Sequence, residues 1–161
     1  MAIRKGQTLP PATMLVLGEK GPETVELDAK LKGRKVVVFG LPGAYTGTCS
    51  TAHLPSFIRT AERFRASGVD EIICISVNDP FVLSAWGNAT GAAAAGITML
   101  GDCDGAFTRA IGMDFNAPQI GLMGRSNRYA AVVENGVVTH VQTDNPGECS
   151  VSTGEALLNA I

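Results

Sequence analysis

Two continuous apolar runs, each followed by a helix signal, constrain the fold of this chain most strongly. They cover residues 35–40 (KVVVFG) and 71–77 (EIICISV) and are rich in β-branched side chains. Such runs indicate strands buried in the centre of a sheet, since half-buried strands alternate apolar and polar residues. Helical spacing of apolar residues follows the first run over Ser50 to Ser67, and the cap Asn78-Asp79-Pro80 follows the second. A strand that leads into a helix twice predicts an α/β fold.

Turn and cap residues complete the predicted order of elements. Pro55 disturbs the first turns of the 50–67 helix, and Gly68 ends it. Asn135-Gly136 predicts a tight hairpin between strands at 129–134 and 137–141. The remaining elements are short segments at 14–17 and 24–27, a strand at 97–100, a short helix at 106–111, and a last helix opened by a Ser152–Glu155 capping box. This order predicts a mixed central sheet with helices on both faces, the arrangement of a thioredoxin-like fold.

Composition predicts one folded domain over residues 1–161. Of the 161 residues, 45% are apolar and 17% charged, which is enough for a single buried core. With 13 Lys+Arg against 15 Asp+Glu, the chain lacks the basic stripe of a nucleic-acid-binding protein. No apolar run approaches the roughly 20 residues of a membrane helix, and no secretory signal is visible. We therefore expect no nucleic-acid or membrane partner and a cytoplasmic location.

The loop that leaves the first central strand, residues 42–49 (PGAYTGTC), places Cys49 in or near the first turn of a helix. Free backbone N–H groups and the positive end of the helix dipole favour an anion there, and they lower the pKa of a cysteine thiol. Open α/β sheets also bind ligands at the carboxyl ends of their strands. Cys49 is therefore either a reactive nucleophile or a small buried side chain, and its neighbours decide between the two.

The neighbours of Cys49 resemble a known family. Pro42, Thr46 and Cys49 fit the P-x-x-x-T-x-x-C signature of peroxiredoxins. The similarity continues in four further segments: HLP at 53–55, SVNDPFV at 76–82, AW at 85–86 and RSNRY at 125–129. In this order they resemble the type II, or peroxiredoxin-five, subfamily.

The resemblance implies a catalytic role for four residues. Cys49 corresponds to the peroxidatic cysteine, which attacks a peroxide oxygen and becomes a sulfenic acid. Thr46 would hydrogen-bond the incoming peroxide, and the Arg128 cation would stabilise the thiolate and then the leaving oxygen. Pro42 would shield the sulfur from water. No metal, haem, flavin or other cofactor is implied.

Other interpretations of these side chains stay open in the sequence. Thr46 is also suited to capping the helix, and Arg125 is the alternative to Arg128 as the catalytic arginine. We prefer Arg128 because of its place in the RSNRY segment, which is an argument from resemblance. His53, on the same helix face as Cys49, is either the base of a Cys-His pair or a structural hydrogen-bonding group, and we expect the structural role.

Cys74 and Cys149 are both candidates for a resolving cysteine, which would reduce the sulfenic acid by forming a disulfide. Cys74 matches the second cysteine of plant-type members, and Cys149 matches that of animal-type members. The run around Cys74 predicts a buried strand, so its pairing would need local unfolding, whereas Cys149 follows a predicted loop at 145–147. Direct reduction by an external thiol is the third possibility. Cys103, between two aspartates, is expected to be unreactive.

The sequence therefore predicts a thiol-dependent peroxidase that reduces hydrogen peroxide and small organic hydroperoxides. Gly47 in place of proline and Tyr45 in place of phenylalanine depart from the subfamily pattern without removing a catalytic group. The resemblance implies thioredoxin, or glutaredoxin with glutathione, as reductant and a homodimer formed near the active-site loop. Phe81 and Trp86 are candidates for the dimer surface or for ordinary helix packing. The alternative function is a redox sensor or relay in which Cys49 passes its oxidation to a client protein.

Overall fold

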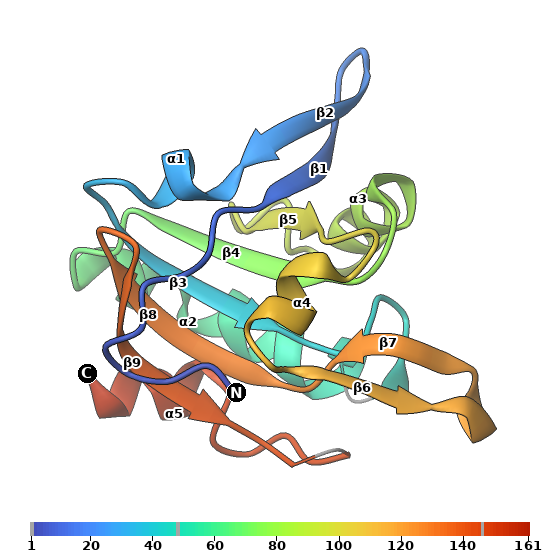
Figure 1. Ribbon diagram of the computed structural model, residues 1–161. Coiled ribbons are helices and arrows are strands. Elements are labelled where there is room, and N and C mark those ends of the chain that lie inside the picture. Colours follow the sequence, from blue (N-terminus) through green and yellow to red (C-terminus); the bar gives the residue numbers. More distant parts are fainter. Residues whose placement is uncertain (1, 48, 146) are drawn as a thin grey trace.

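The computed structural model describes residues 2–47, 49–145 and 147–161, without the side chains of Cys49 and Ser50. Within these ranges, seven strands form one mixed sheet in the order β2-β1-β5-β4-β3-β8-β9 (Figure 1). At its centre β3 (Lys35–Gly40), β4 (Glu71–Ser76) and β5 (Thr98–Gly101) are parallel. The flanking strands pair antiparallel and are β1 (Thr13–Gly18), β2 (Gly21–Glu26), β8 (Tyr129–Glu134) and β9 (Val137–Thr143).

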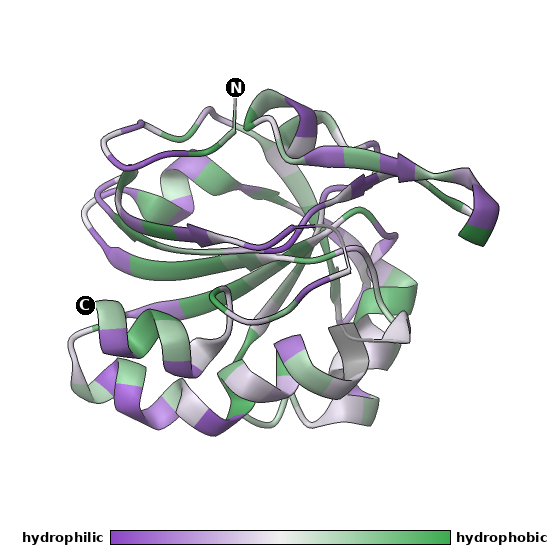
Figure 2. Cartoon of the chain, turned by 90° about the horizontal axis from the view of Figure 1, so that it is seen from below, coloured by the Kyte–Doolittle hydropathy of each residue, from purple (hydrophilic) through white to green (hydrophobic). Residues whose placement is uncertain are grey.

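Alternation along the central strands explains why helices cover both faces of the sheet. In β3, Val37 and Phe39 belong to one buried cluster, and Val36 and Val38 belong to the other. The first face is covered by α2 (Leu54–Ala66), α3 (Pro80–Thr90) and α5 (Gly154–Ala160). The second is covered by α1 (Leu27–Leu31), α4 (Ala106–Ala110) and the N-terminal segment (Figure 2). This is the predicted mixed sheet with helices on both faces.

The helix that follows β3 begins with a widened turn. Residues of η1 (Cys49–His53) form a π-helical turn, and regular α-helix starts at Leu54. Pro55 has no N–H to donate to the carbonyl of Thr51 four residues earlier, so a regular α-helix cannot continue through this point. The disturbance predicted at Pro55 is thus present as a π-helical turn, which is common at functional sites.

The predicted hairpin between β8 and β9 is confirmed. Glu134 pairs with Val137, and Asn135 and Gly136 both have positive φ, 49° and 80°. Positive φ at both central residues is what a tight turn with the twist of its flanking strands requires, and asparagine and glycine adopt it most readily.

The capping box predicted for the last helix is wrong. The N-cap of α5 is Thr153, whose hydroxyl accepts the N–H of Ala156 at 3.1 Å. Ser152 lies one residue too early and bonds to the Asp144 carboxylate instead. A tertiary contact therefore replaces the local cap that the sequence favoured.

A second hairpin was not predicted from the sequence. It consists of β6 (Asp114–Ala117), the 3-10 turn η2 (Pro118–Ile120) and β7 (Leu122–Ser126), and it forms its own two-stranded sheet. Figure 1 shows it projecting from the body of the molecule. No helix in the described ranges is long and apolar enough to cross a membrane.

Candidate active site

The loop after β3 is held by hydrogen bonds at its turn. The hydroxyl of Thr46 donates to the Gly43 carbonyl at 2.8 Å. The N–H of Ala44 donates to Oδ1 of Asn78 at 3.0 Å, and the Ser76 hydroxyl donates to the same oxygen at 2.6 Å. Because Ser76 ends β4, these bonds fix the loop to the carboxyl end of the neighbouring parallel strand, where α/β sheets bind ligands.

A cavity of about 310 Å³ opens beside this loop. Pro42, Thr46 and Arg128 line it, so three of the four predicted catalytic residues lie together. The remaining wall comes mainly from the unpredicted hairpin and consists of Phe115, Ala117, Ile120 and Leu122, with Gly47 and Gly147 at other positions. A hydroxyl and a cation beside apolar walls suit a ligand with a small polar end and an apolar tail.

Cys49 is the fourth predicted residue, and its side chain lies outside the described part of the structure. Its backbone begins η1, the turn between the loop and α2. This agrees with the position predicted for Cys49 near a helix start, which favours an anion.

Arg128 brings a fixed positive charge to the cavity. Only 6% of its surface is exposed, and its guanidinium is a planar cation with several N–H donors. Its Nη1 lies 3.5 Å from the carbonyl of Glu148, and its own carbonyl accepts the N–H of Asp144 at 3.0 Å. Partial exclusion of water strengthens the field of this cation inside the cavity.

Arg125, the alternative catalytic arginine, has a different contact and does not line the cavity. It lies in β7 opposite Phe115, and its Nη1 donates to the carbonyl of Pro42 at 2.9 Å. A Cβ at Gly43 would come within 2.2 Å of this nitrogen, so the guanidinium is packed against the loop backbone. Arg125 thus joins the hairpin to the loop.

His53 makes the structural hydrogen bond that the sequence analysis expected. The ring is fully buried, with edge-on contacts to Phe39 and Phe57, and its Nε2 lies 2.9 Å from the Ser152 carbonyl. Nε2 must carry the proton to make this bond, and Nδ1 has no hydrogen-bond partner among the described residues. Burial, and then the Arg128 charge, lower the pKa of His53 to about 4 against the raising effect of the Ser152 bond. The ring is therefore neutral at pH 7.

The three other cysteines differ in their surroundings. Cys74 is fully buried in β4, as predicted, and Cys149 is partly exposed in the loop before α5. The pKa of the exposed Cys103 thiol is raised by partial desolvation and then by nearby carboxylates, those of Asp79, Asp102 and Asp104. Among the described side chains, no group of three or more His, Cys, Asp or Glu residues is arranged to hold a metal ion.

Asp144 is a structural feature of this region that sequence reasoning missed. Its carboxylate accepts the N–H and hydroxyl groups of Ser150 and Ser152 and the N–H of Val151. Burial acts to raise the pKa of Asp144, but these hydrogen bonds, led by the Ser152 hydroxyl, outweigh it and hold the pKa well below its usual range. The bonds join residues six to eight positions apart, a spacing that matches no standard turn motif.

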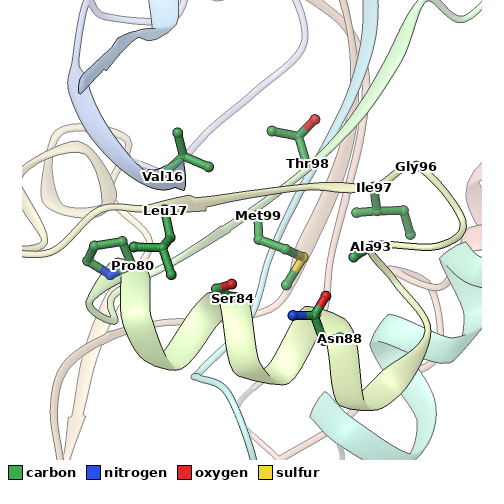
Figure 3. Close-up of a pocket in the computed structure, with 11 residues that line it drawn as sticks. Val16, Leu17, Pro80, Ser84, Asn88, Ala93, Gly96, Ile97, Thr98 and Met99 are labelled. Atoms are coloured by element: carbon green, nitrogen blue, oxygen red, sulfur yellow. The ribbon is translucent and has the colours of Figure 1, made fainter. Parts of the chain in front are cut away.

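A larger cavity, about 400 Å³, lies between α3, β1 and β5 (Figure 3). It opens between β1 and β5, because these two strands pair only at Leu15 and Gly101. Its lining is largely apolar, with Ser84, Asn88 and Thr98 as polar side chains and no titratable group. None of the candidate residues lines it, so the chemistry belongs to the smaller cavity.

Comparisons with known proteins agree with this geometry. The family model described as Redoxin matches residues 4–158. The chain is 39% identical over 160 residues to peroxiredoxin-2D of Arabidopsis thaliana, covering 99% of this chain and 98% of the relative. It superposes on reduced Prx3 from Vibrio vulnificus in complex with hydrogen peroxide with a TM-score of 0.90, at 44% identity and 98% coverage of both chains. Peroxiredoxin 5 from Alvinella pompejana gives a TM-score of 0.85 at 30% identity, covering 98% of this chain and 97% of that one. The thioredoxin-like fold predicted from the sequence is confirmed.

Proposed function

Because this chain belongs to the peroxiredoxin family and is a thiol-dependent peroxidase, we propose that Cys49 is its peroxidatic cysteine. The observation that carries this proposal is the convergence of Pro42, Thr46 and Arg128 on one cavity, beside the turn that Cys49 begins. The substrates are hydrogen peroxide and small organic hydroperoxides, and the apolar hairpin wall would accept the organic part. No cofactor takes part in the proposed reaction.

The proposed first step is attack of the Cys49 thiolate on the terminal oxygen of the peroxide. The S–O bond forms as the O–O bond breaks, giving a cysteine sulfenic acid and an alkoxide or hydroxide that leaves as alcohol or water after protonation. The Thr46 hydroxyl proton is engaged by the Gly43 carbonyl, so its oxygen is left to accept a hydrogen bond from the peroxide. Arg128 stabilises the charge that moves from sulfur to the leaving oxygen, and Pro42 keeps water away.

We infer that the chain belongs to the type II, or peroxiredoxin-five, subfamily, and its similarity to peroxiredoxin-2D and to a peroxiredoxin 5 supports this. The sulfenic acid would then be reduced with the help of thioredoxin, or of glutaredoxin with glutathione. Of the two candidate resolving residues we favour Cys149, because it lies in a partly exposed loop whereas Cys74 lies in the sheet core.

We also propose a cytoplasmic homodimer of single-domain chains, without nucleic-acid or membrane partners. Tyr45 and Phe81 are large apolar side chains with 57% and 59% of their surface exposed, which supports a role in the dimer surface. Trp86 is fully buried, so ordinary helix packing is the right interpretation for it. Sedimentation of the reduced protein tests the dimer.

The deciding experiment treats reduced protein with one equivalent of hydrogen peroxide, blocks the remaining thiols and maps the products by mass spectrometry. Oxidation is expected at Cys49, and Cys49→Ser should lose both the modification and peroxide consumption. Cys103→Ser is the matched control and should keep both. Unmodified Cys49 beside persisting peroxide would contradict the assignment. Turnover with a small thiol donor separates a peroxidase from a redox relay, which would stall without its client.

A further inference from the structure

We propose that Arg125 is a positioning residue that sets the spacing of the two cavity walls and thereby the preference for bulky over small hydroperoxides. This inference rests on the proposed function, because it takes the cavity lined by Thr46 and Arg128 as the peroxide site. It gives Arg125 a role distinct from that of the cation inside the cavity.

The two walls belong to separate parts of the structure. One wall is the loop after β3, with Pro42, Thr46 and Gly47, and it is fixed to the main sheet through Asn78. The other wall is the β6–β7 hairpin, which forms a sheet of its own. A lone two-stranded hairpin is only marginally stable, so its position relative to the loop depends on the contacts that join them.

Arg125 supplies the polar contact between these walls. Among the hydrogen bonds between described residues, the bond from its Nη1 to the Pro42 carbonyl at 2.9 Å is the only one that joins the hairpin to the 42–47 loop. Within the hairpin, Arg125 of β7 pairs with Phe115 of β6, which lines the cavity. A charged donor makes a stronger hydrogen bond than a neutral one, and a guanidinium holds a fixed plane. The position of Phe115 therefore depends on the bond to Pro42.

The close packing around Gly43 restricts this bond further. Gly43 has φ of +155°, and any Cβ there would strike the Arg125 guanidinium. The Arg125 guanidinium therefore lies directly against the loop backbone at Gly43. Shortening or removing the side chain leaves no hydrogen bond between the hairpin and the 42–47 loop among the described residues.

Substrates of different size depend on this separation to different degrees. The peroxide group of any substrate meets Thr46, which lies in the loop, and Arg128, which lies between β7 and β8 and whose carbonyl accepts the N–H of Asp144 outside the hairpin. Only a bulky organic part reaches Phe115, Ile120 and Leu122 on the hairpin. Displacing the hairpin should therefore weaken catalysis with bulky hydroperoxides and spare the reaction with hydrogen peroxide.

The test compares kcat/KM for cumene hydroperoxide and for hydrogen peroxide in the full chain and in Arg125→Ala. The ratio of the two constants should fall about tenfold while the hydrogen peroxide value stays within about twofold, since one methylene's worth of apolar contact changes specificity by about this factor. Arg125→Lys keeps a charged donor of similar reach and should give an intermediate ratio. A structural defect alone would lower both constants together.

Arg65→Ala is the matched control, because Arg65 also donates from a guanidinium to a carbonyl, that of Ala95, away from the cavity. It should leave the ratio unchanged. If Arg125→Ala does not fold, the ratio is measured in Arg125→Gln instead, because glutamine retains an N–H donor but carries no charge. An equal loss for both peroxides, or an unchanged ratio, overturns the inference. Activity that survives Cys49→Ser overturns the proposed function instead, so the two failures are distinguishable.

Discussion

Cys74 and Cys149 occupy opposite kinds of surroundings, although both are candidate partners of Cys49. Cys74 is completely buried in β4, with Phe39 of β3 on one side and Met99 of β5 on the other. Cys149 is partly exposed in the segment between β9 and α5. Releasing Cys74 requires separating parallel strands in the core, whereas releasing Cys149 requires breaking hydrogen bonds of the segment between β9 and α5, several of which are buried. The buried position of Cys74 therefore disfavours it as the partner of Cys49, since pairing would require local unfolding of the sheet.

The segment around Cys149 is held by hydrogen bonds to three parts of the molecule. The Asp144 carboxylate accepts hydrogen bonds from residues 150–152. The Ser152 carbonyl accepts a hydrogen bond from His53 of η1. The Gly154 N–H donates to the Ser56 hydroxyl at 2.9 Å. Two of these contacts depend on a titratable group. The position of Cys149 should therefore respond to acid, whereas the apolar packing of Cys74 should not.

The largest expected effect concerns which thiol forms the disulfide. After one equivalent of hydrogen peroxide, wild-type protein and Cys74→Ser should contain a Cys49–Cys149 disulfide, and Cys149→Ser should contain none. The reason is that a disulfide needs Cα atoms within about 7 Å, which a surface loop reaches more easily than a core strand. Mass spectrometry under non-reducing conditions reads the result. A disulfide that persists in Cys149→Ser but is lost in Cys74→Ser would contradict this prediction. Cys74 would then be the resolving cysteine, and the strands around it would have to open during the cycle.

The next effect is a loss of stability in mild acid caused by His53. Its pKa is about 4 in the folded chain and 6.5 when unperturbed, so the unfolded chain takes up the proton first as the pH falls. Stability is therefore lost progressively between pH 6.5 and about 4, by about 3 kcal/mol in all. Urea denaturation at several pH values across this range measures the loss of stability.

His53→Gln carries no titrating ring and should flatten the stability profile between these pH values. His140→Gln is the control, because His140 lies in β9 away from this contact, and it should keep the wild-type slope. An unchanged slope in His53→Gln would show that the anchoring of the segment does not depend on the neutral ring.

Asp144 should contribute a smaller amount with a different pH dependence. Asp144→Asn is expected to cost about 2 kcal/mol at pH 7, since it weakens several hydrogen bonds to a charged acceptor. The folded pKa of Asp144 is lowered from 3.8, so this contribution is present above that pH and is lost as the pH falls toward the folded value. The difference between wild type and variant should be constant from pH 7 to 5 and shrink below 3.8.

Hydrogen exchange at residues 148–153 shows whether the segment itself is released. Exchange should increase there in Asp144→Asn and stay unchanged in β4. Asp114→Asn, at an exposed position on β6, is the matched control. Faster exchange in β4 would mean that the carboxylate supports the whole fold and not the segment alone.

The same contrast explains which features the sequence predicted. The central strands were predicted to within one residue, at 35–40 and 71–77, because burial on both faces demands a continuous apolar run. Pro42 and Thr46 were found because a local motif carries them. The β6–β7 hairpin has a weak alternating pattern interrupted by Gly121 and Gly124, so no local signal marked it.

The polar contacts of the site were beyond sequence reasoning for a physical reason. Arg125 meets Pro42, and Asp144 meets Ser152, only after the sheet has brought distant segments together. Such bonds join residues that are not neighbours in the sequence, so they produce no periodic pattern from which they could be predicted. Arg128 was preferred over Arg125 on resemblance alone, and the cavity lining agrees with that preference.

The smallest expected effect compares the stability cost of the same substitution at the two cysteines. Cys74→Ser places a hydroxyl in the apolar cluster beneath α2 and α3 and should cost about 1 to 2 kcal/mol, the usual penalty of a poorly partnered buried polar group. Cys149→Ser lies in a partly exposed loop and should change stability by less than about 0.5 kcal/mol. Urea denaturation of the reduced proteins at pH 7 measures both. Equal costs would mean that the loop is packed as tightly as the core, and Cys149 would then have no advantage over Cys74 as the thiol that reaches Cys49.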